Sequence, residues 1–150
     1  MVNMKSMEKE KKIQNDKEDV MTLAASRGFG LHRVGKTVLG VDSSGNYYLI
    51  SESEDYEDLW RDAKIRLNTT NVFPIIDVAD YISSPRDELK KSVVELAIKK
   101  RGLAVFHRGS ELLGVDRNGK KVKLTEVDKE AVLQDKDLLW KKTLEILQVS

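Results

Sequence analysis

The sequence predicts an α+β fold made of two tandem α-β-β-β-α repeats that pack about a pseudo-twofold axis. The first observation is that residues 27–50 align without gaps to residues 101–124, at an offset of 74. The second is that the tetrapeptide LGVD occurs at 39–42 and again at 113–116. The third is that glycines recur at matching positions. Internal repeats of this kind define supersecondary units, so each copy is expected to form the same element order.

The recurring glycines predict the local geometry of the strands. Asn118-Gly119 is a strong hairpin signal, since both central residues of a type I′ turn need positive φ. Gly40 and Gly114 lie inside expected strands, which indicates a bulge or a close backbone approach. Both features fit three short antiparallel strands in each copy.

In the first copy, a helix is predicted from apolar spacing, and one of its faces carries Ile13, Lys17, Val20, Met21 and Ala24. The strands are expected over 29–33, 37–42 and 46–51. A second helix is expected over 54–67, with Trp60 on its apolar face. Ser51 and Glu54 have the spacing of a capping box for this helix.

In the second copy, Ser84-Pro85 marks a helix start, with serine as the cap and proline at the first helical position. The strands are expected over 103–107, 111–116 and 120–125. A final helix is expected over 136–147, with Trp140 covering the sheet, and residues 127–135 are expected to form a short turn of their own.

The repeat divides the chain into four segments within one expected compact unit. Residues 1–12 are expected to be disordered or frayed, or to form the solvated first turns of a long helix. Repeat 1 spans 13–68, and repeat 2 spans 85–150. The connector 69–84 is apolar, so we expect a packed extended piece and a short helix from Asp77; an exposed groove for a partner is the alternative.

Composition excludes several classes of function. The 150 residues include no cysteine, which excludes disulfides, thiol nucleophiles and thiolate metal sites. No apolar run reaches the roughly 18 residues that span a bilayer, and the start of the chain lacks the apolar core of a signal peptide. We therefore expect a cytoplasmic protein with no membrane contact. No catalytic, cofactor-binding or metal-binding motif is found, so we expect no enzyme activity, no cofactor and no metal ion.

Two histidine–arginine pairs are the first candidate site. His32-Arg33 and His107-Arg108 each close a first strand, and a one-residue shift in the alignment brings the pairs into register. Imidazole and guanidinium groups together can bind phosphate or carboxylate. The alternative interpretation is that they are polar strand ends inherited by duplication.

Charge asymmetry between the copies is the second functional signal. Residues 41–62 carry seven acidic side chains against one basic, whereas residues 86–125 carry eleven basic against five acidic. The hairpin of repeat 2 contributes Arg117, Lys120, Lys121 and Lys123 as candidate binding residues. Opposed patches orient association within or between chains, although charge runs are also common on ordinary solvated faces.

Three functions are compatible with these observations. The first is a non-catalytic binding or regulatory protein that acts through protein–protein contacts, with a protein partner or by self-association. The second is a nucleic-acid-binding protein that uses the basic hairpin of repeat 2. The third is a small-molecule sensor with its ligand between the two sheets.

Overall fold

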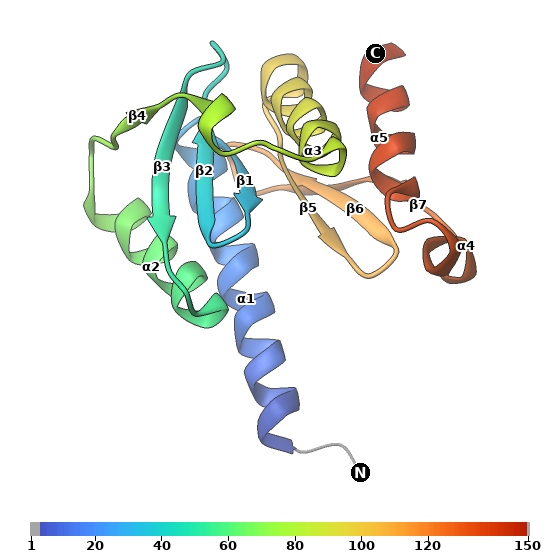
Figure 1. Cartoon of the computed structure of the whole chain (residues 1–150), viewed down its shortest axis with the longest axis horizontal. Coiled ribbons are helices and arrows are strands. Elements are labelled where there is room, and N and C mark those ends of the chain that lie inside the picture. Colours follow the sequence, from blue (N-terminus) through green and yellow to red (C-terminus); the bar gives the residue numbers. More distant parts are fainter. Residues whose placement is uncertain (1–3, 150) are drawn as a thin grey trace.

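The fold is α+β, with two small antiparallel sheets and helices packed around them. The computed structural model describes the backbone of residues 4–149 and the side chains of residues 7–149 (Figure 1). The first half contains α1 (Met4–Ser26), β1 (Gly30–Val34), β2 (Thr37–Val41), β3 (Tyr47–Glu52) and α2 (Tyr56–Thr69). A connector with β4 (Ile75–Ile76) and the 3₁₀ turn η1 (Val78–Asp80) follows. The second half contains α3 (Pro85–Leu96), the π-helical turn η2 (Ala97–Arg101), β5 (Ala104–Arg108), β6 (Glu111–Val115), β7 (Lys121–Glu126), α4 (Lys129–Gln134) and α5 (Leu138–Val149).

The two sheets have the same strand register. In the first sheet, ordered β1-β2-β3-β4, Gly30 lies opposite Val41, and in the second, ordered β5-β6-β7, Ala104 lies opposite Val115. The register of β2 with β3 shifts between Val38 and Leu39, and that of β6 with β7 shifts at the corresponding step. The local pairing of the two hairpins is therefore the same at positions 74 residues apart.

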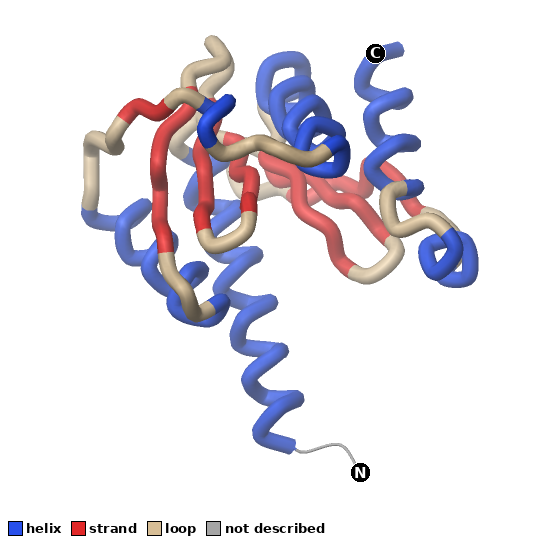
Figure 2. Tube along the Cα trace, viewed as in Figure 1, coloured by secondary structure: helices blue, strands red, loops and turns tan. Residues whose placement is uncertain are grey.

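The helices join the two halves. Helix α1 packs on α2 and also contacts β5 and β6 of the second sheet, while α3 packs on α5 and contacts β1 of the first (Figures 1 and 2). One buried cluster accordingly combines Val20 of α1 and Leu31 of β1 with Phe106 of β5 and Val115 of β6. Because each core contains side chains from both halves, neither half can bury its apolar side chains without the other.

Close approach explains the glycines inside the strands. A Cβ added at Gly40 would lie 3.0 Å from Cδ1 of Ile50, and one added at Gly114 would lie 3.0 Å from Cδ1 of Leu103. Real Cβ atoms rarely come this near to another heavy atom, so a side chain here would displace its neighbour. The structure shows the close approach at both glycines, and a shift in strand register lies beside each of them, between Val38 and Leu39 and between Leu112 and Leu113.

Two details of the sequence prediction are wrong. Helix α2 is capped by Asp55, whose carboxylate accepts from the Asp58 amide 3.0 Å away, and not by a Ser51–Glu54 capping box. Ser51 is buried and donates to the Leu59 carbonyl instead. The 118–119 turn is not type I′ either, because within the described residues positive φ occurs only at glycines. The Asp116 carboxylate accepts from the amides of Asn118 and Lys120, so the aspartate organises the turn.

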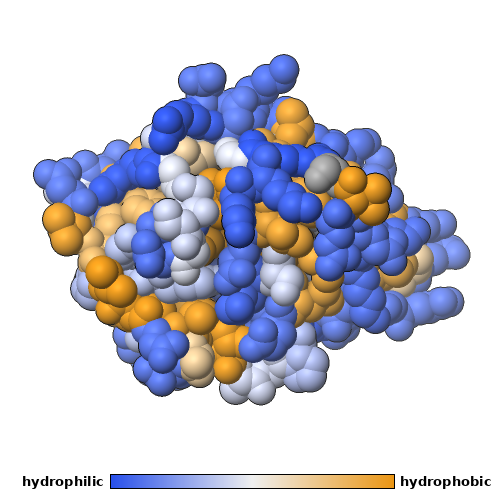
Figure 3. Space-filling model, turned by 90° about the horizontal axis from the view of Figure 1, so that it is seen from above, coloured by the Kyte–Doolittle hydropathy of each residue, from blue (hydrophilic) through white to orange (hydrophobic). Residues whose placement is uncertain are grey.

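The connector forms the expected extended piece and short helical turn. Ile75 and Ile76 pair with Tyr48 and Tyr47 of β3, and Asp77 caps η1. Its packing is mixed, because Phe73 is buried while Val72 and Ile75 are exposed. The face seen from above in Figure 3 is a mosaic of hydrophilic and hydrophobic side chains.

The N-terminal helix begins before the predicted first repeat. Residues 4–12, for which the sequence left open a frayed start or the first turns of a helix, are part of α1, and residues 1–3 lie outside the described residues. Among the helices of residues 4–149, none is both long and apolar enough to cross a bilayer.

Candidate anion-binding pocket

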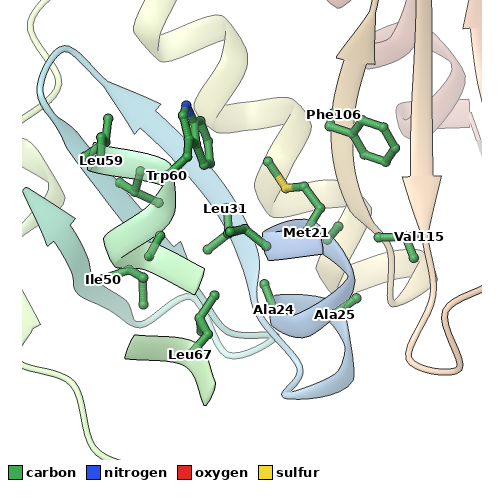
Figure 4. Close-up of a cluster of buried hydrophobic side chains, with 14 of the residues drawn as sticks. Met21, Ala24, Ala25, Leu31, Ile50, Leu59, Trp60, Leu67, Phe106 and Val115 are labelled. Carbon is green, nitrogen blue, oxygen red and sulfur yellow. The ribbon is translucent and has the colours of Figure 1, made fainter. Parts of the chain in front are cut away.

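A pocket of about 100 Å³ lies where the two halves meet. Its apolar lining includes Met21 of α1, Leu31 of β1, Trp60 of α2 and Phe106 of β5. In Figure 4 these four side chains lie in a row, from Trp60 through Leu31 and Met21 to Phe106. Since the lining comes from both halves, the pocket exists only in the folded whole.

Three cations surround this apolar lining. The Nζ atom of Lys17 lies 5.6 Å from the ring centre of Trp60, and that of Lys90 lies 5.4 Å from the ring centre of Trp140. The guanidinium carbon of Arg33 lies 5.2 Å from the ring centre of Tyr56. Each cation therefore rests on an aromatic face, which is a favourable electrostatic contact.

None of these three cations forms a salt bridge among the described residues. Neighbouring basic residues do: Lys91 lies 3.2 Å from Glu95, and Arg86 lies 2.7 Å from Asp137. The lining residues that the structure describes include no aspartate or glutamate. The pocket is therefore a concentration of positive charge with no internal counter-charge.

His32 is a buried polar side chain without a protein partner. It is 3% exposed, it lines the pocket, and neither ring nitrogen has a hydrogen-bond partner among the described residues. The Trp60 indole nitrogen is likewise buried without a partner. A buried polar group left unpaired costs about 1–3 kcal/mol, so such groups call for a structural or functional explanation.

The pKa values follow from burial and from the crowding of cations. Burial and the charges of Arg33 and Lys90 together lower the pKa of Lys17 to about 8, against a smaller opposing effect of Glu18. Burial, with the nearby Arg33, also lowers the pKa of Lys90. Burial lowers the pKa of His32 to about 4. At neutral pH the pocket thus combines charged lysines with a neutral imidazole.

The two predicted histidine–arginine pairs are placed differently. His32, Arg33 and His107 line the pocket, but Arg108 does not. The strands match at an offset of 74 without the expected one-residue shift, since His32 lies opposite Leu39 and Phe106 lies opposite Leu113. His32 therefore corresponds to Phe106 and Arg33 to His107. His107 is exposed at the rim, where the surrounding protein and the charges of Lys17 and Lys90 lower its pKa.

The basic residues of the second hairpin lie away from the pocket. Arg108 and Lys121 both contact the carboxylate of Glu18 on α1, and Lys123 lies 2.6 Å from Glu126. Although burial opposes it, hydrogen bonds from Arg108, Lys121 and Gln14 lower the pKa of Glu18.

Arg117 and Lys120 lie in the exposed turn between β6 and β7. Arg117 lines a separate open hollow with Asp116, with Ala25 at the end of α1 and with Ile98 and Arg101 of η2. The structure therefore divides the predicted binding residues among the central pocket, the contacts with Glu18 and Glu126, and this turn.

Among the residues that the structure describes, no ion pair joins the acidic helix α2 to the basic hairpin. Glu57 of α2 lies 3.8 Å from Lys9 and 3.6 Å from Lys12, and Lys64 of α2 lies 3.0 Å from Asp19. Helix α1 thus pairs with α2 through one set of side chains and with the second sheet through Glu18. The charge asymmetry of the sequence is partly neutralised by α1 within the chain.

Sequence reasoning did not select Lys17 and Lys90 as site residues. Lys17 carried a usable signal, because it is a lysine on the otherwise apolar face of α1. Lys90 was visible only as one charge among many on α3. Their convergence on the two tryptophans depends on how the helices cross between the halves.

Comparisons with known proteins add no relative. The chain matches no protein-family model, and no match is found among curated proteins or solved structures. Within residues 7–149, whose side chains the structure describes, no group of three or more histidine, cysteine, aspartate or glutamate side chains could hold a metal ion. The chemistry of the pocket is therefore the main guide to function.

Proposed function

We propose that this chain is a non-catalytic binding protein that holds a small anion in the pocket between its halves. The observation that carries the proposal is the set of three cations without carboxylate partners, Lys17, Arg33 and Lys90, beside the unpartnered imidazole of His32. A phosphate or carboxylate group would accept hydrogen bonds from such donors and offset their mutual repulsion.

The size and lining of the pocket favour a compact ligand. Its volume of about 100 Å³ is well below the roughly 300 Å³ at which drug-sized sites begin. The walls include the rings of Trp60, Trp140 and Phe106, against which a flat apolar group can pack. Inorganic phosphate and a small aromatic carboxylate such as benzoate are therefore suitable probes.

Removing one pocket lysine is expected to weaken binding of these probes by about 10- to 100-fold, because a hydrogen bond to a charged group contributes about 1.5–3 kcal/mol. Lys17→Met and Lys90→Met keep the aliphatic stem over the tryptophan while removing the charge. Isothermal titration calorimetry at pH 7 with phosphate and with benzoate gives the affinities.

The matched control is Lys120→Met, which removes the same charge from the exposed turn and is expected to leave binding unchanged. The proposal fails if neither anion binds the unmodified protein. It also fails if the pocket and control variants bind equally well, since the affinity would then depend on net charge alone.

Binding is expected to weaken as the pH rises through about 8. Lys17 faces Arg33, Lys90, His107 and Glu18, and burial brings its pKa down to about 8. Below that pH the ammonium is present to pair with the anion, and above it the neutral amine is not. Binding is therefore linked to proton uptake, which calorimetry in buffers of different ionisation enthalpy detects. Benzoate is the probe for this test, because unlike phosphate it does not change its charge over this range. A flat benzoate affinity between pH 7 and pH 9 contradicts this role of Lys17.

We also propose that the chain consists of two tandem α-β-β-β-α repeats related by a pseudo-twofold axis that passes through the pocket. The equal strand registers, 74 residues apart, support this arrangement. So does the matching placement of Lys17 on Trp60 and Lys90 on Trp140. On this view, the difference between His32 and Phe106 makes the pocket asymmetric and gives the anion one preferred orientation.

The nucleic-acid alternative remains a second proposal, supported by the exposed Arg117 and Lys120 in the β6–β7 turn. Fluorescence anisotropy with labelled DNA and RNA across a salt series distinguishes the two. A linear fall of log affinity with log salt concentration, whose slope decreases by about one in Lys120→Met but not in Lys17→Met, favours nucleic acid. Binding that is weakened in Lys17→Met but unchanged in Lys120→Met favours the pocket.

A further inference from the structure

The outer edge of β7 is a strand edge without a partner in the described part of the chain. The second sheet ends at β7 in the order β5-β6-β7, and β7 pairs only with β6. An edge of this kind presents unpaired backbone N–H and C=O groups to which another strand can be added.

The first half shows how such an edge is covered. Tyr47 and Tyr48 of β3 pair with Ile76 and Ile75 of β4 in antiparallel fashion, and the Leu49 amide donates to the Pro74 carbonyl 3.0 Å away. By register with the preceding strand, Leu49 corresponds to Lys123, since Leu49 lies opposite Leu39 and Lys123 lies opposite Leu113. The amide of Lys123 is thus the one expected to point outward from β7.

The side chains of β7 define the chemistry of a partner. Lys121 and Lys123 are exposed on one face, whereas Val122 and Leu124 are half-buried on the other, toward the cluster that includes Leu139 and Leu147 of α5. Lys123 and Glu126 form an exposed pair, which contributes at most about 1 kcal/mol and is readily exchanged. Lys121 lies 3.3 Å from the largely buried carboxylate of Glu18, which Arg108 also contacts, so Glu18 keeps a basic partner when Lys121 turns to a ligand. An incoming strand that alternates acidic and apolar residues complements both faces.

We infer that the β7 edge binds an extended acidic peptide segment of a partner protein by antiparallel strand addition. Pairing of two copies through β7 is disfavoured, because it brings the lysines of the two copies together across the new strand pair, and like charges on facing strands are destabilising. The inference is independent of the anion pocket, which lies at the junction of the halves and is lined by other residues.

The test uses a fluorescein-labelled ten-residue peptide of alternating valine and glutamate with the full-length protein. Fluorescence anisotropy is expected to show binding that falls about tenfold in the Lys121→Glu/Lys123→Glu double variant, since each cross-strand attraction becomes a repulsion. Two control peptides, one with lysine for glutamate and one with a central proline, are expected not to bind. Equal binding of either control overturns the inference, as does no binding of the acidic peptide.

Amide hydrogen exchange measured by NMR tests the backbone geometry without a substitution. On saturation with the acidic peptide, exchange at Lys123 is expected to slow by at least about tenfold, because its amide acquires a partner. The adjacent Val122 amide points the opposite way, toward β6, and is expected to change little. Strand addition is overturned if exchange at Lys123 is unchanged in the peptide-saturated protein. It is also overturned if single-stranded DNA displaces the peptide while exchange at Lys123 stays the same.

Discussion

Replacing Phe106 with alanine is expected to lower the free energy of unfolding by about 3–5 kcal/mol. Phe106 is 1% exposed on β5, and its ring packs in the cluster that includes Val20 of α1 and Leu31 of β1. Truncation removes this contact and extends the adjoining pocket into a larger cavity. Urea unfolding followed by tryptophan fluorescence measures the loss, which corresponds to a fall in Tm of about 6–20 °C for a chain of this length.

The same substitution tests whether the halves unfold together. Trp60 reports on the first half and Trp140 on the second, so Trp140→Phe and Trp60→Phe backgrounds separate the two signals. Because Phe106 contacts both halves, its truncation is expected to lower both unfolding midpoints equally. A matched control is Leu133→Ala, whose side chain is 82% exposed and whose effect is expected to stay within about 0.5 kcal/mol. A shift confined to the Trp140 signal contradicts the shared core.

Local structure was largely predictable from the sequence, because short-range patterns determine it. The turns of β2–β3 and β6–β7 follow from Asp42 and Asp116, which accept hydrogen bonds from amides two residues further on. The start of α3 follows from Ser84 and Pro85 in the same way. The Ser51–Glu54 capping box was wrong because Asp55 competes for the same role and burial directs Ser51 to the Leu59 carbonyl.

The candidate pocket was only partly predictable, because it depends on how the halves cross. His32, Arg33 and His107 were selected from a local pattern, and all three line it. Lys17 and Lys90 lie on helices whose packing against both sheets no local pattern specifies. The basic hairpin was prominent in the sequence, yet Glu18 of α1 partly neutralises it through a contact between residues far apart in the chain.

Replacing His32 with phenylalanine is expected to raise the free energy of unfolding at pH 7 by about 1–3 kcal/mol. The substitution removes two buried nitrogens that lack a protein partner, and it introduces the residue that occupies the corresponding position, 106, on β5. The extra volume of the ring faces the pocket. Binding of phosphate and benzoate is expected to weaken in the same variant, because the imidazole no longer donates to the anion.

The pH dependence of stability distinguishes this effect from a simple gain in packing. Burial lowers the pKa of His32 to about 4 in the folded protein; Asp87 opposes this shift, while Lys90, Arg33 and Lys91 add to it. In the unfolded chain the pKa is about 6.5. Between these two pH values the unfolded state therefore binds more protons at His32 than the folded state does. Above pH 6.5 this difference does not change the free energy of unfolding, and as the pH falls toward 4 it lowers that free energy by up to about 3 kcal/mol.

The difference in unfolding free energy between His32→Phe and the unmodified protein is thus expected to widen as the pH is lowered from 7.5 to 4.5. Groups common to both proteins, such as the carboxylates of Glu18 and Asp42 with their lowered pKa values, cancel in this difference. Urea unfolding at each pH measures it. If this difference is constant across the range, His32 does not change its protonation on unfolding. If the variant is less stable than the unmodified protein at every pH, the imidazole has a partner that the phenyl ring cannot bind. Either result would contradict the assignment of His32 as an unsatisfied donor held ready for an anion.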